Sequence, residues 1–114
     1  MGLIREGTNM TKLQELLEKV EAGDCKNDGS MFRVFGDEWM QCFDAYNGSL
    51  DAAKSLHEAV LPDFRTVYVY QSDTKWCWQI ENSEIIRGYG ESSNPARSWL
   101  IAILKALIAM EEAK

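Results

Sequence analysis

The sequence has little of the chemistry that most catalytic and metal sites need. It holds one histidine, His57, and three widely spaced cysteines, Cys25, Cys42 and Cys77, with no CxxC pair. An odd number of separated cysteines argues against a disulfide framework or a zinc knuckle, and is typical of reduced thiols in a cytosolic protein. The acidic residues are scattered with no D-x-D-x-D loop, so a calcium or magnesium site has no support. We therefore predict no catalytic, cofactor or metal site, and expect a protein that is not an enzyme.

Positive charge is also scarce, and the longest apolar run is too short for a membrane. The chain has 12 lysines and arginines against 18 aspartates and glutamates, a formal charge of −6. Nucleic acid is not expected as a partner, because generic binding to phosphates needs clustered cations. The apolar run over 99–110 is interrupted at Lys105 and falls short of the roughly 18 residues of a span. With no apolar stretch typical of a secretory signal at its start, the chain is expected in the cytoplasm.

What is present is ordinary globular material, and the chain length of 114 residues favours one domain. Residues 1–9 show no periodicity and are expected to form a flexible tail before a single domain over 10–114. Met10 directly precedes a strong helix signal, which leaves it as an alternative to Met1 as the native start. A capping-box spacing and an apolar stripe predict the first helix over 11–23.

Two helices are expected in the middle of the chain. Residues 30–46 carry a helical apolar stripe that Gly36 interrupts, and 32–35 alone would also suit a short strand. We expect a helix that is broken or kinked near Gly36. Ser49 then provides an N-cap, and Pro62 ends an amphipathic helix of about three turns.

The last helix is the most apolar part of the chain. Asn94 and Pro95 are typical of an N-cap and a first helical position, and from Trp99 to Met110 only Lys105 is polar. A helix that is apolar on nearly every face must be covered by other elements, so we predict that the chain folds around it. The stripe that we expect to face the sheet comprises Leu100, Ile103, Leu104 and Leu107.

Three strands are predicted between the last two helices, over 64–71, 76–81 and 84–89. Their short links require antiparallel neighbours, which makes a meander. Gly88 and Gly90 weaken the third strand and indicate a bulge or an edge. The predicted fold class is α+β in the order α-α-α-β-β-β-α, a two- or three-layer sandwich. Because the first strand is apolar or aromatic on both faces, we expect helices on both sides of the sheet.

Two segments, AYNGSLDAAKSLHEAVLP over 45–62 and SSNPARSWLIAILKAL over 92–107, resemble the phage α-β-α sandwich domain, a family of small uncharacterised proteins of bacteriophages and prophages. The first helix, LQELLEKVEAG, is similar as well. The resemblance implies a layered sandwich and a phage origin, and therefore the cytoplasm of a bacterial host cell. It implies no activity and supplies no site residues.

The order of elements over 49–110 is also that of the double-stranded RNA binding domain, which grips phosphates with lysines at the start of its last helix. Here that position has one basic residue, Arg97. The charges that would bind RNA are missing, so we rank RNA binding low. An acidic surface that mimics nucleic acid is ranked equally low, because the net charge is modest for that role.

Several single features favour structural over functional roles. His57 lies beside the apolar stripe of its helix, and no nucleophile accompanies it, so we expect a structural histidine and not a general base. The G-x-G at Gly88 and Gly90 precedes a helix N-terminus, but a bulge and a cap explain it better than an anion site does. Arg97 is expected to assist an anion there or to pair with Glu91.

The aromatic residues leave most room for function. A small layered domain cannot bury so many large rings, and exposed Trp and Tyr are favoured at protein interfaces. We therefore predict a non-enzymatic accessory module that binds an unknown protein partner or a second copy of itself. The candidate interface residues are Trp39, Tyr68, Tyr70, Trp76, Trp78 and Tyr89.

Overall fold

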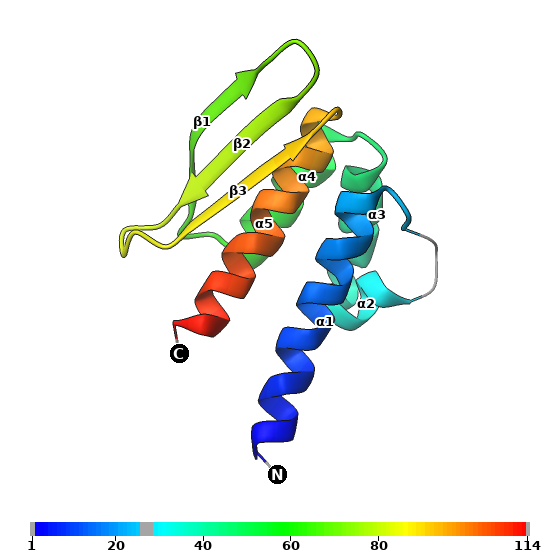
Figure 1. Ribbon diagram of the computed structural model, residues 1–114, viewed down its shortest axis with the longest axis vertical. Helices are drawn as coiled ribbons and strands as arrows, with labels where there is room; N and C mark the ends of the chain where they lie inside the picture. The colour runs from blue at the N-terminus through cyan, green and yellow to red at the C-terminus, as the bar shows by residue number, and fades with distance from the viewer. Residues whose placement is uncertain (1, 26–28, 114) are drawn as a thin grey trace.

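The computed structural model describes residues 2–25 and 29–113, and side chains from residue 10 onward. An antiparallel sheet in the order β1-β2-β3 lies on one side of the helices (Figure 1). The predicted α+β class and the predicted order of elements are confirmed. The elements are α1 (Gly2–Ala22), α2 (Ser30–Phe35), a 3-10 turn (Gly36–Glu38), α3 (Trp39–Tyr46), α4 (Leu50–Val60), β1 (Arg65–Gln71), β2 (Trp76–Glu81), β3 (Arg87–Ser92) and α5 (Pro95–Glu112).

Two predicted helix starts are confirmed by their capping geometry. The Ser49 side chain accepts a hydrogen bond from the Ala52 amide at 3.1 Å, and the Asn94 side chain accepts one from the Arg97 amide at 3.1 Å. Each bond satisfies an amide that has no partner within its helix. Polar side chains in the sequence therefore place the starts of α4 and α5.

The break expected near Gly36 is also confirmed. Gly36 has a φ of 57° and begins the 3-10 turn that separates α2 from α3. Side chains other than glycine rarely adopt this left-handed conformation, so the helix ends where glycine permits the turn.

The first helix begins earlier than its capping box indicates. It extends from Gly2, so most of the segment that we expected to be a tail lies within the bounds of α1. A separate tail over 1–9 and the choice between Met1 and Met10 stay predictions, and Met1 lies outside the described residues. The predicted loop after α1 includes residues 26–28, which also lie outside them.

The third strand begins three residues later than we predicted, at Arg87 and not at Glu84. The cause is the Asn82 side chain, whose oxygen accepts hydrogen bonds from the amides of Glu84 and Ile86 at 3.0 and 2.9 Å. Asparagine side chains compete with strand pairing in this way. The segment 82–86 is therefore a turn.

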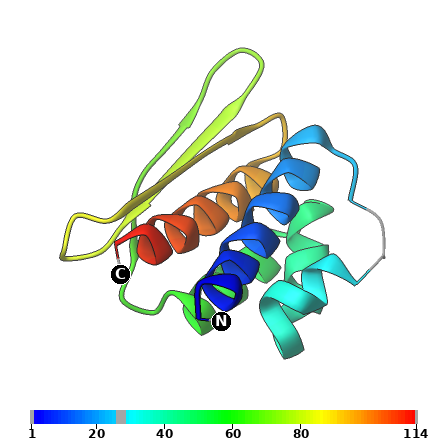
Figure 2. The ribbon, with the colours of Figure 1, turned by 60° about the horizontal axis from the view of Figure 1, so that its bottom comes forward.

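Helix α5 lies between the sheet and the other helices, as Figure 2 shows. Leu100, Ile103 and Leu104 of this helix are fully buried. The prediction that the chain folds around α5 therefore agrees with the structure. The expectation of helices on both sides of the sheet is wrong, because the described helices all lie on one side and leave the other face of the sheet open (Figure 2).

The stripe of α5 that meets the sheet differs from our prediction. A Cβ atom added to Gly88 would overlap the Ala102 carbonyl oxygen, and one added to Gly90 would overlap that of Ser98. Positions 98, 102 and 106 lie on the opposite side of a helix from Leu100, Ile103, Leu104 and Leu107. Small residues therefore face β3, because its glycines bring the two backbones together, and the large aliphatic residues pack among the helices.

Candidate interaction surface

Strand β1 is the most exposed element of the sheet. All seven of its residues are exposed, although the strand is rich in apolar and aromatic side chains. Helix α5 packs on β2 and β3, and β2 is the only described element that packs extensively on β1. We name four of its residues the β1 surface; their exposed fractions are 44% for Val67, 45% for Tyr68, 41% for Val69 and 54% for Tyr70.

The register of the sheet shows which side chains occupy the open face. Trp78 pairs with Gly90, which faces α5, so neighbouring positions such as Cys77 and Tyr89 face away from the helix. Tyr68 and Tyr70 pair with Gln79 and Cys77 and share that open face. The open face therefore carries tyrosines from both edges of the sheet.

Charged residues on the open face are paired with one another. Glu81 lies 3.0 Å from Arg87 and 3.5 Å from Arg65, and Glu91 lies 3.8 Å from Lys75. These pairs leave little net charge with which to attract a phosphate backbone or a cation. The face is thus better suited to a protein partner than to a highly charged ligand.

Tyr89 belongs to a small polar network on this face. Its hydroxyl donates to the Glu91 carboxylate at 3.2 Å, and the Cys77 thiol donates to the same carboxylate at 3.7 Å. The hydrogen bond with Cys77, together with burial and the Glu91 carboxylate, raises the pKa of the Tyr89 phenol above its ordinary value. The network holds the Tyr89 ring in place at the β3 edge.

The six predicted interface residues do not form one surface. Tyr68, Tyr70 and Tyr89 share the open face, and the structure brings these three together. Trp76 and Trp78 are on the helix-facing side, and the Trp78 ring stacks on Trp99 with the centroids 4.3 Å apart. Trp39 lies on α3, partly buried against the core.

Val67 and Val69 complete the β1 surface, although neither is among the six interface residues predicted from the sequence. Val67 and Val69 alternate with Tyr68 and Tyr70, so the strand is apolar or aromatic on both faces. The same pattern is expected for a strand that is covered on both faces and for one that is exposed on both. The pattern therefore suits a strand between two layers of helices equally well. The sequence contains no signal that separates the two cases; the packing does, since α5 is the only helix that packs on the sheet to any extent in the described chain.

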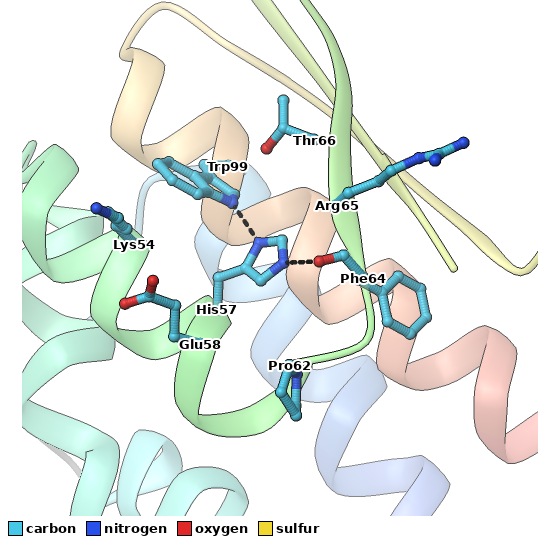
Figure 3. A pocket seen from close by; sticks show the side chains of 8 residues that line it. All are labelled: Lys54, His57, Glu58, Pro62, Phe64, Arg65, Thr66 and Trp99. Carbon is cyan, nitrogen blue, oxygen red and sulfur yellow. Dashed lines mark hydrogen bonds between the residues drawn. The ribbon is translucent and has the colours of Figure 1, made fainter. Parts of the chain in front are cut away.

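A cleft of about 400 Å³ lies beside the start of β1 (Figure 3). It is formed between α4, the link that leads into β1, and the Trp99 side chain of α5. His57 lies at its base and is 6% exposed. The residues that line the cleft are Lys54, His57, Glu58, Pro62, Phe64, Arg65, Thr66 and Trp99.

Both ring nitrogens of His57 have partners. The Trp99 indole N–H donates to Nδ1 at 2.9 Å, and Nε2 lies 2.8 Å from the Phe64 carbonyl oxygen. The indole can only donate and the carbonyl can only accept, so Nε2 carries the proton of a neutral imidazole. A proton acceptor or a metal ligand needs a nitrogen that is not already occupied. The geometry thus supports the structural role predicted for His57, which joins α4, α5 and the start of β1.

Arg97 does not pair with Glu91, so that expectation is wrong, whereas its expected help to an anion stays a prediction. Its Nε donates to the Tyr46 carbonyl oxygen at 3.1 Å, and its guanidinium lies 4.1 Å from the centroid of the Tyr46 ring. Arg97 therefore ties the start of α5 to the end of α3. The cation that would begin a double-stranded RNA site is occupied within the fold.

The cysteines form no disulfide with one another. Burial raises the pKa of the Cys42 thiol, and the nearby Cys25 adds to the effect, so Cys42 is not a reactive thiolate at neutral pH. Within 2–25 and 29–113, no three residues among histidine, cysteine, aspartate and glutamate gather as a metal site would require.

No family model, curated protein or solved structure matches this chain. Among the helices of the described residues, none has the length and apolar character needed to cross a membrane. The assignment of function therefore depends on the surfaces of the fold itself.

Proposed function

We propose that this chain is a non-enzymatic protein-binding module that uses the β1 surface and the adjoining open face of the sheet. The observation that carries the proposal is the exposure of Val67, Tyr68, Val69 and Tyr70 on one edge strand. An edge strand offers unpaired backbone groups, and exposed aromatic and β-branched side chains beside them are what a partner strand can cover. The setting suggested by the family resemblance is that of an accessory protein of a phage or prophage.

The proposal explains why exposed apolar residues concentrate at β1. Burying such side chains contributes about 25 cal/mol for each Å² of apolar surface, so a partner gains from covering them together. Tyrosine adds a hydroxyl that stays hydrogen-bonded at the rim of an interface. The paired charges on the same face set little electrostatic barrier against a protein.

Capture of a partner from host cells that carry the phage or prophage would test this function. The tagged protein is compared with a Tyr68→Ser/Tyr70→Ser variant and with a control, Phe32→Ser/Met40→Ser, which removes exposed apolar residues from α2 and α3. We expect the wild type and the control to retain the same protein, and the β1 variant to lose it. Retention by the β1 variant with loss by the control would contradict the proposal.

A second candidate is a nucleic-acid-associated or nucleic-acid-mimicking module, which is supported by the order α4-β1-β2-β3-α5. The engagement of Arg97 with Tyr46 and the charge of −6 weigh against direct binding. Retention on heparin that weakens as salt is added would support nucleic-acid contact. Capture of a host DNA-binding enzyme would support mimicry instead.

A further inference from the structure

We propose that the partner of the β1 surface is a second copy of this chain. The two β1 strands pair antiparallel across a two-fold axis at Val69, which joins the two sheets into one. This inference rests on the proposed function, because it uses the same surface, and it goes further by naming the occupant and the register. Three features of β1 support it: the direction of its backbone groups, its side chains and the charges at its ends.

The backbone amide and carbonyl groups of Val69 point away from β2. The Ser72 amide donates to the Lys75 carbonyl oxygen at 2.8 Å, which closes the turn between β1 and β2. Backbone groups alternate in direction along a strand, so those of Tyr70 face β2 and those of Val69 and Gln71 face outward. In an antiparallel pair centred on Val69, the outward groups of Val69 meet those of its counterpart.

The side chains match in this register. Val69 lies opposite Val69 of the second copy, and Tyr68 lies opposite Tyr70 on the open face. Aromatic and β-branched cross-strand pairs stabilise a sheet. The irregular pairing between Thr66 and Tyr68 is at one end of β1, so the stretch from Tyr68 to Gln71 remains regular.

Charges at the two ends of β1 are complementary to those of a second copy. The first charged residues around Val69 are Arg65 on one side and Asp73 on the other. A two-fold axis at Val69 brings the Arg65 end of one copy beside the Asp73 end of the other, so opposite charges approach each other at both ends of the pair. This pattern favours a second copy, although two chains with a charge of −6 repel each other elsewhere.

These charges are available for the pairing. Arg65 and Asp73 are both exposed. Arg65 contacts Glu81 at 3.5 Å, but Glu81 keeps Arg87 at 3.0 Å when Arg65 turns away. Between Arg65 and Gln71 the strand has no acid, lysine or proline, which are the residues that commonly protect an edge from self-pairing.

Charge reversal tests both the partner and the register. Sedimentation equilibrium of the wild type from about 1 to about 500 µM should show a monomer–dimer equilibrium. Arg65→Asp places two acids opposite each other at each end of the pair, and Asp73→Arg places two cations there. Each variant alone should dimerise at least about tenfold more weakly. An equimolar mixture of the two variants restores opposite charges at both ends and should form a heterodimer, and the double variant R65D/D73R should dimerise like the wild type.

Two exposed residues on other parts of the sheet provide matched controls. Arg87→Asp removes the other partner of Glu81, and Glu84→Arg reverses a charge in the second turn; both should dimerise like the wild type. Circular dichroism checks that every variant is folded.

A wild type that stays monomeric over this range overturns the inference. Dimerisation of both single variants with the affinity of the wild type overturns the register. The proposed function can survive the failure of this inference. If the wild type is monomeric but Tyr68→Ser/Tyr70→Ser abolishes capture of another protein, the β1 surface binds a different partner. If that variant also leaves capture unchanged, both proposals fail.

Discussion

The two edges of the sheet are opposites in composition and in packing. Strand β3 carries Gly88 and Gly90, and both are buried where α5 packs on the strand. Strand β1 carries valines and tyrosines, and all of its residues are exposed. The edge that presents glycines to α5 is covered, and the edge with large side chains on both faces is bare.

The glycines of β3 are packing residues. Without Cβ atoms, the strand backbone approaches the α5 backbone at Ser98, Ala102 and Ala106, where a larger residue would hold the helix away. Large side chains on β1 have no such helix to meet. They contribute less to the packing of the fold than the β3 glycines do. Substitutions on β1 should therefore lower the free energy of unfolding less than substitutions on β3.

The largest effect is expected from side chains added to β3. Gly88→Ala or Gly90→Ala would push a Cβ atom into the α5 backbone, where neither element can move easily, and should lower the free energy of unfolding by about 3 kcal/mol or more. Val67→Ala on β1 should cost less than about 1 kcal/mol. Urea unfolding of the three variants measures the contrast. Similar costs at both edges would contradict the role given to the glycines.

Proline distinguishes the two sides of the β1 backbone. Tyr70→Pro removes an amide that faces β2 and should cost about 2 kcal/mol or more, whereas the amide of Val69 faces outward and Val69→Pro should leave a folded chain. Thermal unfolding compares the two. If the wild type dimerises as proposed, the folded Val69→Pro protein should be monomeric at the same concentrations. Equal destabilisation by the two prolines would show that the directions assigned to the backbone groups of β1 are incorrect.

A smaller effect is expected where β1 is anchored to the helices. Trp99→Phe removes the donor to His57 Nδ1 and leaves a buried acceptor unsatisfied, at a cost of about 2 kcal/mol. Trp76→Phe, on the same side of the sheet, serves as the control. Amide hydrogen exchange in the Trp99→Phe variant should increase at residues 64–66 before it increases in β3. A uniform increase would show that His57 does not anchor β1 in particular.

The smallest effect is a pH dependence at β3. The raised pKa of Tyr89 means that the native chain holds this proton more tightly than the unfolded chain does. The resulting stabilisation is present below the ordinary tyrosine pKa of about 10 and is lost as the pH rises through the higher native value. Ultraviolet titration should therefore show a late-ionising tyrosine that Tyr89→Phe removes. An unchanged titration curve would contradict the hydrogen bonding described for Tyr89.

Local signals in the sequence determined much of this fold. Ser49 and Asn94 place the starts of two helices through their own side-chain hydrogen bonds, and Gly36 breaks the helical segment because glycine alone adopts its backbone conformation readily. The strands and their antiparallel order follow from β-branched runs joined by short links. These features depend on residues within a few positions of one another, so the sequence shows them directly.

Only the tertiary structure decided which surfaces meet. Helix α5 is apolar on nearly every side, so its sequence does not distinguish the stripe that faces the sheet; the distance set by Gly88 and Gly90 selects the small residues. The bonds of His57 to Trp99 and Phe64 join residues from three elements, and no local pattern predicts them. The exposure of β1 has the same origin, because the sequence of a strand that is apolar on both faces does not show whether a helix covers it. Local residues determine where elements begin and end, whereas the packing of distant elements determines which apolar faces remain for a partner.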